Sequence, residues 1–193
     1  MILTCGFDEA GRGPLAGPVT AACVILPSDF PFDILNDSKK LSEKKRYFAE
    51  PIIKEKSLWG IGIVDHKKID EINILQASLL AMKLAYEQMA EKLPLWCEDH
   101  RISNYELSGI TDGTKCPDVP FFCICEPKAD GKYHEVMAAS ILAKTCRDRI
   151  MEEMDRMYPE YGYARHKGYP TKDHREICRK IGPSPIQRLS FKY

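Results

Sequence analysis

Four acidic residues are the part of this sequence with the clearest potential for chemistry. Asp8 and Glu9 end an apolar stretch directly before a glycine-containing turn, and Asp112 and Asp130 each follow a later apolar stretch. Carboxylate oxygens are the ligands that Mg²⁺ and Mn²⁺ prefer, commonly together with substrate phosphates. Two such ions in one site promote in-line displacement at phosphorus. The four acids therefore predict a metal-dependent nuclease.

An ordinary structural explanation competes with this prediction. Asp112-Gly113 and Asp130-Gly131 are also common turn pairs, so neither indicates a metal site when taken alone. Four carboxylates at one point would repel one another unless cations compensate their charge. The acids are therefore either a metal site or a set of unrelated turns, and the surrounding elements decide which.

Hydrophobic patterning predicts the elements that would position these acids. We expect strands over residues 1–7, 18–26, 57–64, 104–111 and 121–126, so that the acids lie at strand ends. A helix should begin after Ser42, a plausible N-cap, and a long amphipathic helix should cover residues 65–92. Asn73 is expected to interrupt that helix and Pro94 to end it. Further helices are expected over residues 132–158 and 171–180, which gives an α/β domain with a mixed sheet.

Three segments offer groups that suit a nucleic acid. Gly11-Arg12-Gly13 combines a backbone that permits close approach with a guanidinium for a phosphate or a base edge. Lys167 and Tyr169 offer a cation beside an aromatic ring, and Lys39 lies in a polar segment that suits a phosphate. A mobile turn, a packed loop tyrosine and a solvated loop would explain the same residues without a ligand.

Composition narrows the class of protein without selecting a function. The length of 193 residues predicts a single domain. Equal numbers of basic and acidic residues argue against a protein that is basic overall but are compatible with a local basic groove. None of the eight cysteines forms a C-x-x-C pair, so we interpret them as buried free thiols. No stretch is long and apolar enough for a membrane span, and we expect a cytoplasmic protein.

Taken together, these motifs resemble the type 2 ribonuclease H (ribonuclease HII) family. The resemblance runs in order along nearly the whole chain through Asp8-Glu-Ala-Gly-Arg-Gly-Pro14, Asn36-Asp-Ser-Lys39, Asp112-Gly113, Lys128-Ala-Asp130, Ala138-Ala-Ser-Ile-Leu-Ala-Lys144, Arg147-Asp148, His166-Lys-Gly-Tyr169 and Pro183-Ser-Pro-Ile-Gln-Arg-Leu-Ser-Phe191. It implies a ribonuclease H-like fold, a five-stranded mixed sheet flanked by helices. Residues from about 160 onward would form a small C-terminal helical part that contacts substrate.

The same resemblance implies an activity and a role for each matched residue. The enzyme would hydrolyse the RNA strand of RNA–DNA hybrids and cut 5′ to ribonucleotides embedded in duplex DNA, leaving 3′-hydroxyl and 5′-phosphate ends. Such an activity belongs to ribonucleotide excision repair and DNA replication. Asp8, Glu9, Asp112 and Asp130 match the acids that hold Mg²⁺ or Mn²⁺, two ions in the catalytic complex. The matched substrate-binding residues are Gly11, Arg12, Gly13, Lys39, Lys144, Lys167 and Tyr169.

The sequence departs from the family pattern in three places, one of which is the run His134-Glu-Val-Met137 before Ala138. Ala129 stands where the family usually has glycine, and Gln187 where histidine is common. A monomer is expected, and no motif identifies a replication protein that recruits the enzyme. The rival hypotheses are a nucleic-acid-binding module without catalysis, a metal hydrolase for small molecules, and an α/β domain whose acids are turn residues.

Overall fold

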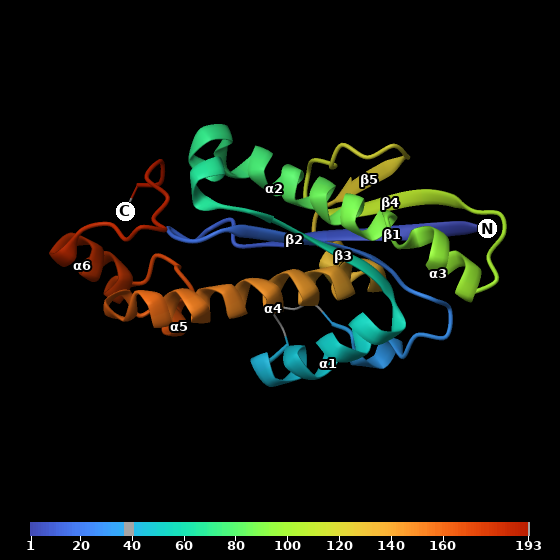
Figure 1. Ribbon diagram of the computed structural model, residues 1–193, viewed down its shortest axis with the longest axis horizontal. Coiled ribbons are helices and arrows are strands. Elements are labelled where there is room, and N and C mark those ends of the chain that lie inside the picture. The colour runs from blue at the N-terminus through green and yellow to red at the C-terminus, as the bar shows by residue number, and fades with distance from the viewer. Residues whose placement is uncertain (37–40, 193) are drawn as a thin grey trace.

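A computed structural model describes residues 1–36 and 41–192 of the chain, and Figure 1 shows it as one sheet covered by helices on both faces. The sheet has five strands in the order β3-β2-β1-β4-β5: β1 (Ile2–Ala10), β2 (Val19–Ile25), β3 (Leu58–Val64), β4 (Glu106–Asp112) and β5 (Cys123–Glu126). β1 pairs antiparallel with β2 and parallel with β4, and β4 pairs parallel with β5. The predicted mixed α/β sheet is confirmed.

Parallel pairing brings three strand ends to the same edge of the sheet. Phe7 of β1 pairs with Thr111 of β4, so Asp8 and Asp112 follow a paired position on neighbouring strands. Asp112 in turn pairs with Glu126, the last residue of β5. β1 runs through both acids and ends at Ala10, three residues beyond the predicted end. The carboxylates therefore project from hydrogen-bonded strand backbone rather than from loops.

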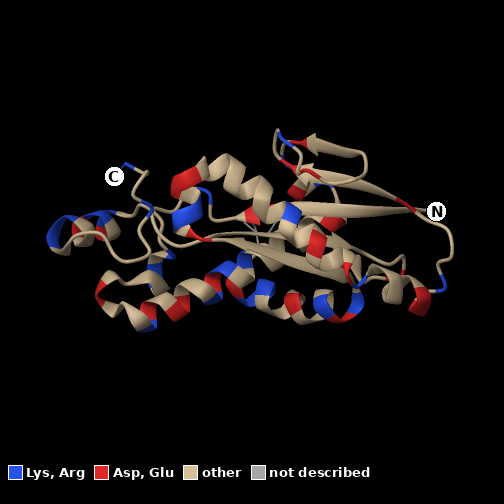
Figure 2. Cartoon of the chain, turned by 45° about the horizontal axis from the view of Figure 1, so that its top comes forward, with Lys and Arg blue, Asp and Glu red and all other residues tan. Residues whose placement is uncertain are grey.

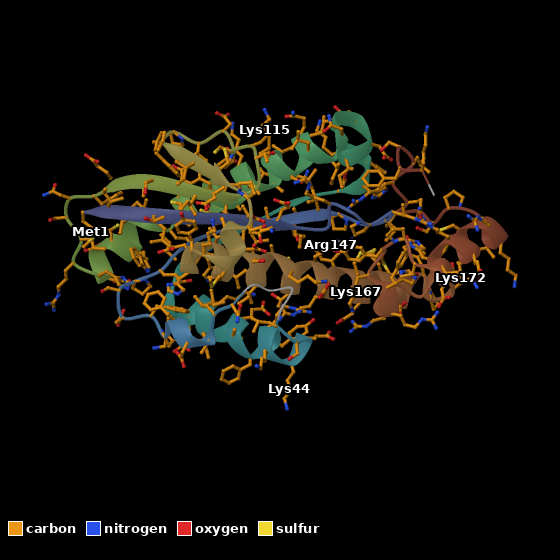
Figure 3. All side chains as sticks on the ribbon, turned by 180° about the vertical axis from the view of Figure 1, so that it is seen from behind. Met1, Lys44, Lys115, Arg147, Lys167 and Lys172 are labelled. Carbon is orange, nitrogen blue, oxygen red and sulfur yellow. The ribbon has the colours of Figure 1, made fainter. Side chains whose placement is uncertain are left out.

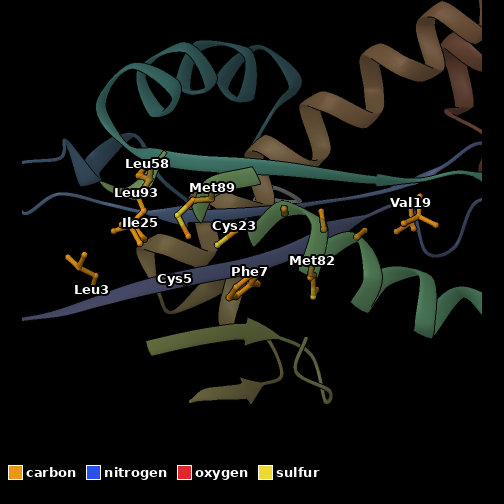
Figure 4. Close-up of a cluster of buried hydrophobic side chains, with 14 of the residues drawn as sticks. Leu3, Cys5, Phe7, Val19, Cys23, Ile25, Leu58, Met82, Met89 and Leu93 are labelled. Carbon is orange, nitrogen blue, oxygen red and sulfur yellow. The ribbon is translucent and has the colours of Figure 1, made fainter. Parts of the chain in front are cut away.

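One face of the sheet is covered by α2 (His66–Ala90) and α3 (Leu93–Asp99), as Figure 1 shows. Alternate residues of β1 such as Leu3, Cys5 and Phe7 pack there against Met82 and Met89 of α2, in the core shown in Figure 4. Gly60 and Gly62 let β3 approach α2 closely, because a Cβ on either would overlap the backbone of that helix. This core fixes the strands that carry the acids.

The opposite face is covered by α4 (His134–Met157), with α1 (Glu43–Lys56) packed beside it. Ala22 and Val24 of β2 contact a run of buried alanine and aliphatic side chains on α4. α1 begins as predicted, because the Ser42 hydroxyl accepts a hydrogen bond from the Lys45 N–H (3.3 Å). α4 thus lies directly under the strand end that carries Asp8.

Two details of the helix prediction have different outcomes. Asn73 does interrupt α2, with φ of 68°, and its side chain accepts hydrogen bonds from the N–H groups of Leu75 and Gln76, as an N-cap does. The prediction that Pro94 ends the helical region is wrong. α2 ends at Ala90, and Pro94 lies in the first turn of α3, where its missing N–H leaves no hydrogen bond unmade.

The chain after α4 forms a small helical part that returns to the N-terminal turn. It comprises three short helices, η3 (Pro159–Tyr161), α5 (Tyr163–His166) and α6 (Lys172–Ile181), beyond the end of the sheet in Figure 1. After α6, Gln187 forms a β-bridge with Ala16. The Asp70 carboxylate of α2 then accepts hydrogen bonds from the N–H groups of Leu189 and Ser190. The C-terminal segment therefore packs against residues 14–17, which are buried, whereas Arg12 and Gly13 stay exposed.

Candidate active site

Three of the four predicted acids converge on one point. Oxygen atoms of Asp8, Asp112 and Asp130 all lie within 4.8 Å of one another, and no other cluster of three potential ligands occurs within residues 1–36 and 41–192. Asp130 comes from η2 (Ala129–Gly131), the turn that follows β5. Asp8 and Asp130 are buried and Asp112 is half-buried. Two strand ends and the turn after β5 thus bring three of the four acids together, and their role as a metal site stays a prediction.

The oxygens of this cluster are oriented by neighbouring donors. Oδ1 of Asp8 accepts a hydrogen bond from the Glu9 N–H (2.7 Å), and Ser140 of α4 also hydrogen-bonds the Asp8 carboxylate. Oδ1 of Asp112 accepts from the Ala129 N–H (3.0 Å). Hard oxygen ligands held in this way on rigid elements suit a divalent cation of the Mg²⁺ or Mn²⁺ type.

The same closeness makes the cluster electrostatically unfavourable without a cation. The pKa of Asp8 is raised well above its ordinary value, first by burial and then by the charges of Glu9 and Asp112. The hydrogen bonds from Ser140 and from the Glu9 backbone act in the opposite direction and lower this pKa. A bound divalent cation would favour the ionised form, because an opposite charge at close range stabilises a carboxylate.

Glu9, the fourth acid, stands beside the cluster rather than within it. Its side chain lines the same cavity as Asp8 and Asp112, and its Oε1 lies 3.4 Å from Nη1 of Arg12. The Glu9 carboxylate nevertheless lies near enough for its charge to raise the pKa of Asp8. The structure therefore groups three acids closely and places the fourth at the edge of the group.

The cavity that Asp8, Glu9 and Asp112 line also contains most of the predicted substrate-binding residues, whereas Asp130 is not among its lining residues. It measures about 360 Å³, and Gly11, Arg12, Gly13, Lys144 and Tyr169 form its other walls. The Tyr169 ring is 40% exposed and lies beside Gly13. Lys144 Nζ stands 6.0 Å from the centre of that ring and donates a hydrogen bond to Asp148 (2.5 Å). Cations, an aromatic face and carboxylates thus share one concave surface.

Two buried arginines hold the turn that carries Gly11, Arg12 and Gly13. The Arg147 guanidinium of α4, labelled in Figure 3, donates hydrogen bonds to the carbonyl oxygens of Ala16, Pro18 and Lys167. The Arg188 guanidinium donates to the carbonyl oxygens of Gly11, Arg12, Pro14, Gly17 and Pro18. Burial lowers the pKa of both arginines, yet arginine stays charged in proteins. These two side chains therefore fix the backbone of the turn.

Gly11 is required by this arrangement. Its φ of 103° is a conformation that residues with a Cβ rarely adopt, and a Cβ there would overlap the Arg147 side chain. Gly13 has no such restriction, and a Cβ on it would meet only Tyr169, at an ordinary distance of 3.7 Å. The two glycines of the motif thus serve different purposes: one permits the turn, and the other leaves its surface open.

The two remaining predicted substrate contacts are Lys167 and Lys39. Lys167 does not line the cavity, and its Nζ donates a hydrogen bond to Glu152 (2.7 Å) while its carbonyl accepts from Arg147. Lys39 falls outside the described residues. Sequence reasoning assigned no role to Arg46 and Ser140, which line the cavity, nor to Arg188, although Ser140 and Arg188 stand inside the quoted motifs.

The departures from the family pattern at Ala129 and Gln187 differ in how well they fit the local structure. The Ala129 methyl group is buried against Ile110 and Val136, and the Ala129 N–H donates to Asp112. Gln187 is buried beside Ala16, and its Oε1 accepts from the Cys178 thiol (3.8 Å), but its Nε2 is buried without a hydrogen-bond partner among the described residues. Neither side chain enters the acidic cluster.

Comparison with a solved structure defines the class of protein. The ribonuclease H2 from Pyrococcus horikoshii superposes with a TM-score of 0.70 at 25% sequence identity, covering 98% of this chain and 94% of that one. The shared sheet is that of the ribonuclease H-like hydrolases. The acids at neighbouring strand ends therefore belong to a nuclease fold.

Comparison of sequences then gives the family. The ribonuclease HII family model matches residues 5–193. The ribonuclease HII of Treponema denticola is 53% identical over 197 residues, covering 98% of both chains, and that of Porphyromonas gingivalis is 47% identical over 190 residues, covering 97% of this chain and 88% of the relative. The chain belongs to the ribonuclease HII family and is an endoribonuclease that acts on RNA–DNA hybrids.

Proposed function

We propose that Asp8, Glu9, Asp112 and Asp130 are the catalytic acids and that they hold Mg²⁺ or Mn²⁺, two ions in the catalytic complex. The observation that carries this proposal is that Asp8 and Asp112 of the acidic cluster line the same cavity as the glycine turn. The donor set suits such ions, because it consists of carboxylate oxygens on two strand ends and on the turn after β5. When bound, the ions would activate the attacking water and stabilise the leaving 3′-oxygen.

The chain's own groups would position the scissile phosphate and keep the acids ionised. Ser140 and the Glu9 N–H would hold Asp8 in one orientation, and the Ala129 N–H would do the same for Asp112. Arg12, whose guanidinium is half-exposed beside Glu9, would reach a phosphate of the cut strand. The acids would then act on a strand whose position is set by the opposite wall of the cavity.

Recognition of the ribonucleotide would come from the turn formed by Gly11, Arg12 and Gly13. Only the 2′-hydroxyl distinguishes RNA from DNA at a given nucleotide, so a reader must approach the sugar closely. Gly13 leaves that approach open, and the Tyr169 ring beside it would stack near the ribonucleotide junction. We propose that this pair selects 5′ incision at ribonucleotides embedded in duplex DNA, as well as cleavage of longer hybrids.

Basic side chains beyond the cavity would bind the flanking duplex. Lys144 stands at the rim, and we propose Lys39 and Lys167 as further phosphate contacts, Lys167 after release from Glu152. Figure 2 shows basic residues on α6, where Lys172, Arg175, Arg179 and Lys180 are all exposed. Residues from about 160 onward would thus form the substrate-contacting part of a single catalytic domain. Such contacts make affinity depend steeply on salt.

We further propose that the protein works as a cytoplasmic monomer on hybrid or ribonucleotide-containing DNA. No helix within the described residues is long and apolar enough to span a membrane.

The decisive experiment uses a labelled DNA duplex that contains one ribonucleotide, incubated with Mg²⁺ or Mn²⁺. Cleavage is expected 5′ to the ribonucleotide, with 3′-hydroxyl and 5′-phosphate ends, and an all-DNA duplex should remain intact. Asp112→Asn should lose this cleavage, whereas the matched control Asp99→Asn, at an exposed position on α3, should keep it. Cleavage by the Asp112 variant at the wild-type rate would contradict the proposed site.

A further inference from the structure

Three cysteines gather at the outer edge of the sheet, away from the residues used above. Cys123 and Cys125 lie on the edge strand β5, and Cys116 lies in the segment that connects β4 to β5 (Figure 1). The Cys116 thiol donates a hydrogen bond to the Cys123 carbonyl oxygen (3.2 Å), and its Sγ lies 2.7 Å from Sγ of Cys125. Cys116 and Cys125 are therefore close enough to bond with little movement of either side chain.

The fold holds these two sulfur atoms together from both sides. Cys125 pairs with Thr111 of β4, and the Gly109 N–H donates to the Phe122 carbonyl oxygen, which fixes β5 to the sheet. The segment that carries Cys116 is held to α2 by an ion pair between Asp118 and Lys83 (2.7 Å). Lys115, the residue before Cys116, is labelled at the surface in Figure 3. The proximity of the thiols thus depends on the native structure.

The arrangement does not suit a metal ion. Within the described parts of the chain, Asp8, Asp112 and Asp130 are the only group of three or more ligating side chains whose donor atoms share one point. The Cys123 sulfur lies 3.3 Å from the Thr111 hydroxyl and also interacts with the Cys116 thiol, but the three sulfur atoms do not meet at one point. The close Cys116–Cys125 pair therefore points to redox chemistry rather than to metal binding.

The two thiols differ in accessibility, which sets the order of events. Cys125 is exposed, whereas Cys116 is half-buried, and burial together with the neighbouring thiols raises the pKa of Cys116. Cys5, Cys23, Cys97 and Cys178 are buried. An external reagent therefore meets Cys125 first, because exchange requires an accessible sulfur. The sequence-based prediction that the cysteines are buried is confirmed for those four, wrong for the exposed Cys125, and only partly met by Cys116, Cys123 and Cys146, which are half-buried.

We propose that Cys116 and Cys125 form a thiol–disulfide exchange site for low-molecular-weight disulfides. The Cys125 thiolate attacks one sulfur of the reagent, whose S–S bond breaks and whose other half leaves as a thiol. Cys116 then loses its proton to solvent and attacks Sγ of Cys125, which releases the second half as a thiol. The protein pair is oxidised by two electrons and one reagent disulfide is reduced to two thiols, so atoms and electrons balance.

Oxidation would close the loop between residues 116 and 125 covalently. This loop begins shortly after Asp112, and the Gly113 N–H donates to the Glu126 carbonyl oxygen at its base. The bridge would therefore fasten the segment that leaves the acidic cluster to the edge strand, and excess thiol would reopen it. This site is independent of the proposed catalytic residues.

Treatment of the folded, metal-free protein with oxidised glutathione, followed by peptide mapping under non-reducing conditions, tests the proposal. The first product expected is an intramolecular Cys116–Cys125 disulfide, with the loss of two titratable thiols and of two hydrogen masses. Cys116→Ser should instead accumulate a glutathione adduct on Cys125, and Cys125→Ser should lose the fast reaction. Cys146→Ser, at another half-buried thiol, should behave as the wild type does.

Two results would overturn the proposal. One is a stable glutathione adduct on Cys125 in the wild type, because Cys116 would then be unable to resolve it. The other is first formation of a disulfide between any other pair of cysteines. Repeating the oxidation in denaturant tests the dependence on the fold without any variant. The preference for the Cys116–Cys125 pair should disappear when the structure is lost.

Discussion

The two walls of the catalytic cavity are built in different ways. The acidic wall consists of residues at the ends of neighbouring strands, oriented by backbone N–H groups and by Ser140 of α4. The glycine wall is a turn whose carbonyl oxygens are held by Arg147 from α4 and Arg188 from the C-terminal segment. The acidic wall depends mainly on the pairing of strands, and the glycine wall depends on two buried guanidinium groups.

The two walls therefore have opposite effects on the stability of the fold. The acidic wall brings like charges together, so in the absence of cations it opposes folding while it serves catalysis. In the glycine wall, arginine side chains donate hydrogen bonds to the carbonyl groups of the turn and so anchor the C-terminal segment. This wall therefore supports both folding and recognition. Substitutions that remove charge from the acidic wall should therefore raise stability, and substitutions that remove hydrogen bonds from the glycine wall should lower it.

The largest effect is expected for Asp8→Asn. Cleavage should fall by roughly a thousandfold or more, since a metal ligand contributes several kcal/mol to the transition state. The metal-free variant should nevertheless melt at a higher temperature. Because the folded pKa of Asp8 is raised above its ordinary value, this residue stabilises the fold below that ordinary pKa, and the stabilisation is lost as pH rises through the folded pKa.

Calorimetry of both proteins in the presence of a chelator, beside a cleavage assay, measures these two changes. A lower melting temperature for Asp8→Asn at neutral pH would show that carboxylate repulsion is not significant in the acidic wall.

Arg188→Ala should have the next largest effect and the opposite sign on stability. The substitution removes five hydrogen bonds that the buried guanidinium donates to backbone carbonyl groups. Their loss should lower the free energy of unfolding by about 3 kcal/mol or more. Substrate cleavage should fall with it, whereas the affinity of the folded fraction for Mn²⁺ should change little. Urea unfolding and metal titration at low temperature measure the two quantities.

Arg179→Ala is the matched control, because Arg179 is an exposed arginine on α6 in the same C-terminal part. Equal loss of stability in both variants would mean that the turn does not depend on Arg188.

Substitution of the two glycines should separate the shape of the turn from its open surface. Gly13→Ala should reduce kcat/KM on a single-ribonucleotide duplex by about tenfold with little change in melting temperature, since one added methyl near the sugar is worth ~1–3 kcal/mol. Gly11→Ala should lose activity and also destabilise the fold, because of its positive φ and its contact with Arg147. Parallel kinetics and melting curves distinguish the two, and an inactive but fully stable Gly11 variant would contradict this division.

The smallest effect concerns pH and Ser140. Metal binding requires ionised Asp8, whose pKa is raised, so the affinity for Mn²⁺ should decrease as pH falls below the folded pKa. Ser140→Ala removes a hydrogen bond that lowers this pKa, and the decrease should therefore begin up to about one pH unit higher. Metal titrations across pH measure the displacement. A displacement toward lower pH would indicate that Ser140 does not stabilise the carboxylate.

The acidic wall could be predicted from the sequence because its signals are local. An apolar run followed by Asp8 or by Asp112 marks a strand end, and parallel strands place such ends at one edge. The interruption of α2 at Asn73 was similarly predictable from a residue that tolerates positive φ. Pro94 was misread because proline suits both the residue after a helix and the first turn of the next one.

The glycine wall could not be predicted to the same depth. Its motif was visible, but nothing near Arg188 indicates that this side chain is buried against the carbonyl groups of residues 11–18. A buried arginine whose hydrogen bonds go to backbone carbonyl groups contradicts the usual expectation for charged residues, so composition offers no signal for it. The ion pair between Lys167 and Glu152 escaped prediction for a related reason, since the two lie on different elements.

The hydrogen bonds from Arg188 to the Gly11 turn have a consequence for synthesis of the protein. Domains form progressively from the N-terminus as the ribosome extends the chain. The strands, α2 and α4 could assemble on the emerging polypeptide, and with them the acidic cluster. The turn, however, receives its anchoring guanidinium from a residue 177 positions later. Substrate recognition would thus be completed only when the C-terminal segment leaves the exit tunnel, so a nascent chain would carry its acids before it could select a ribonucleotide.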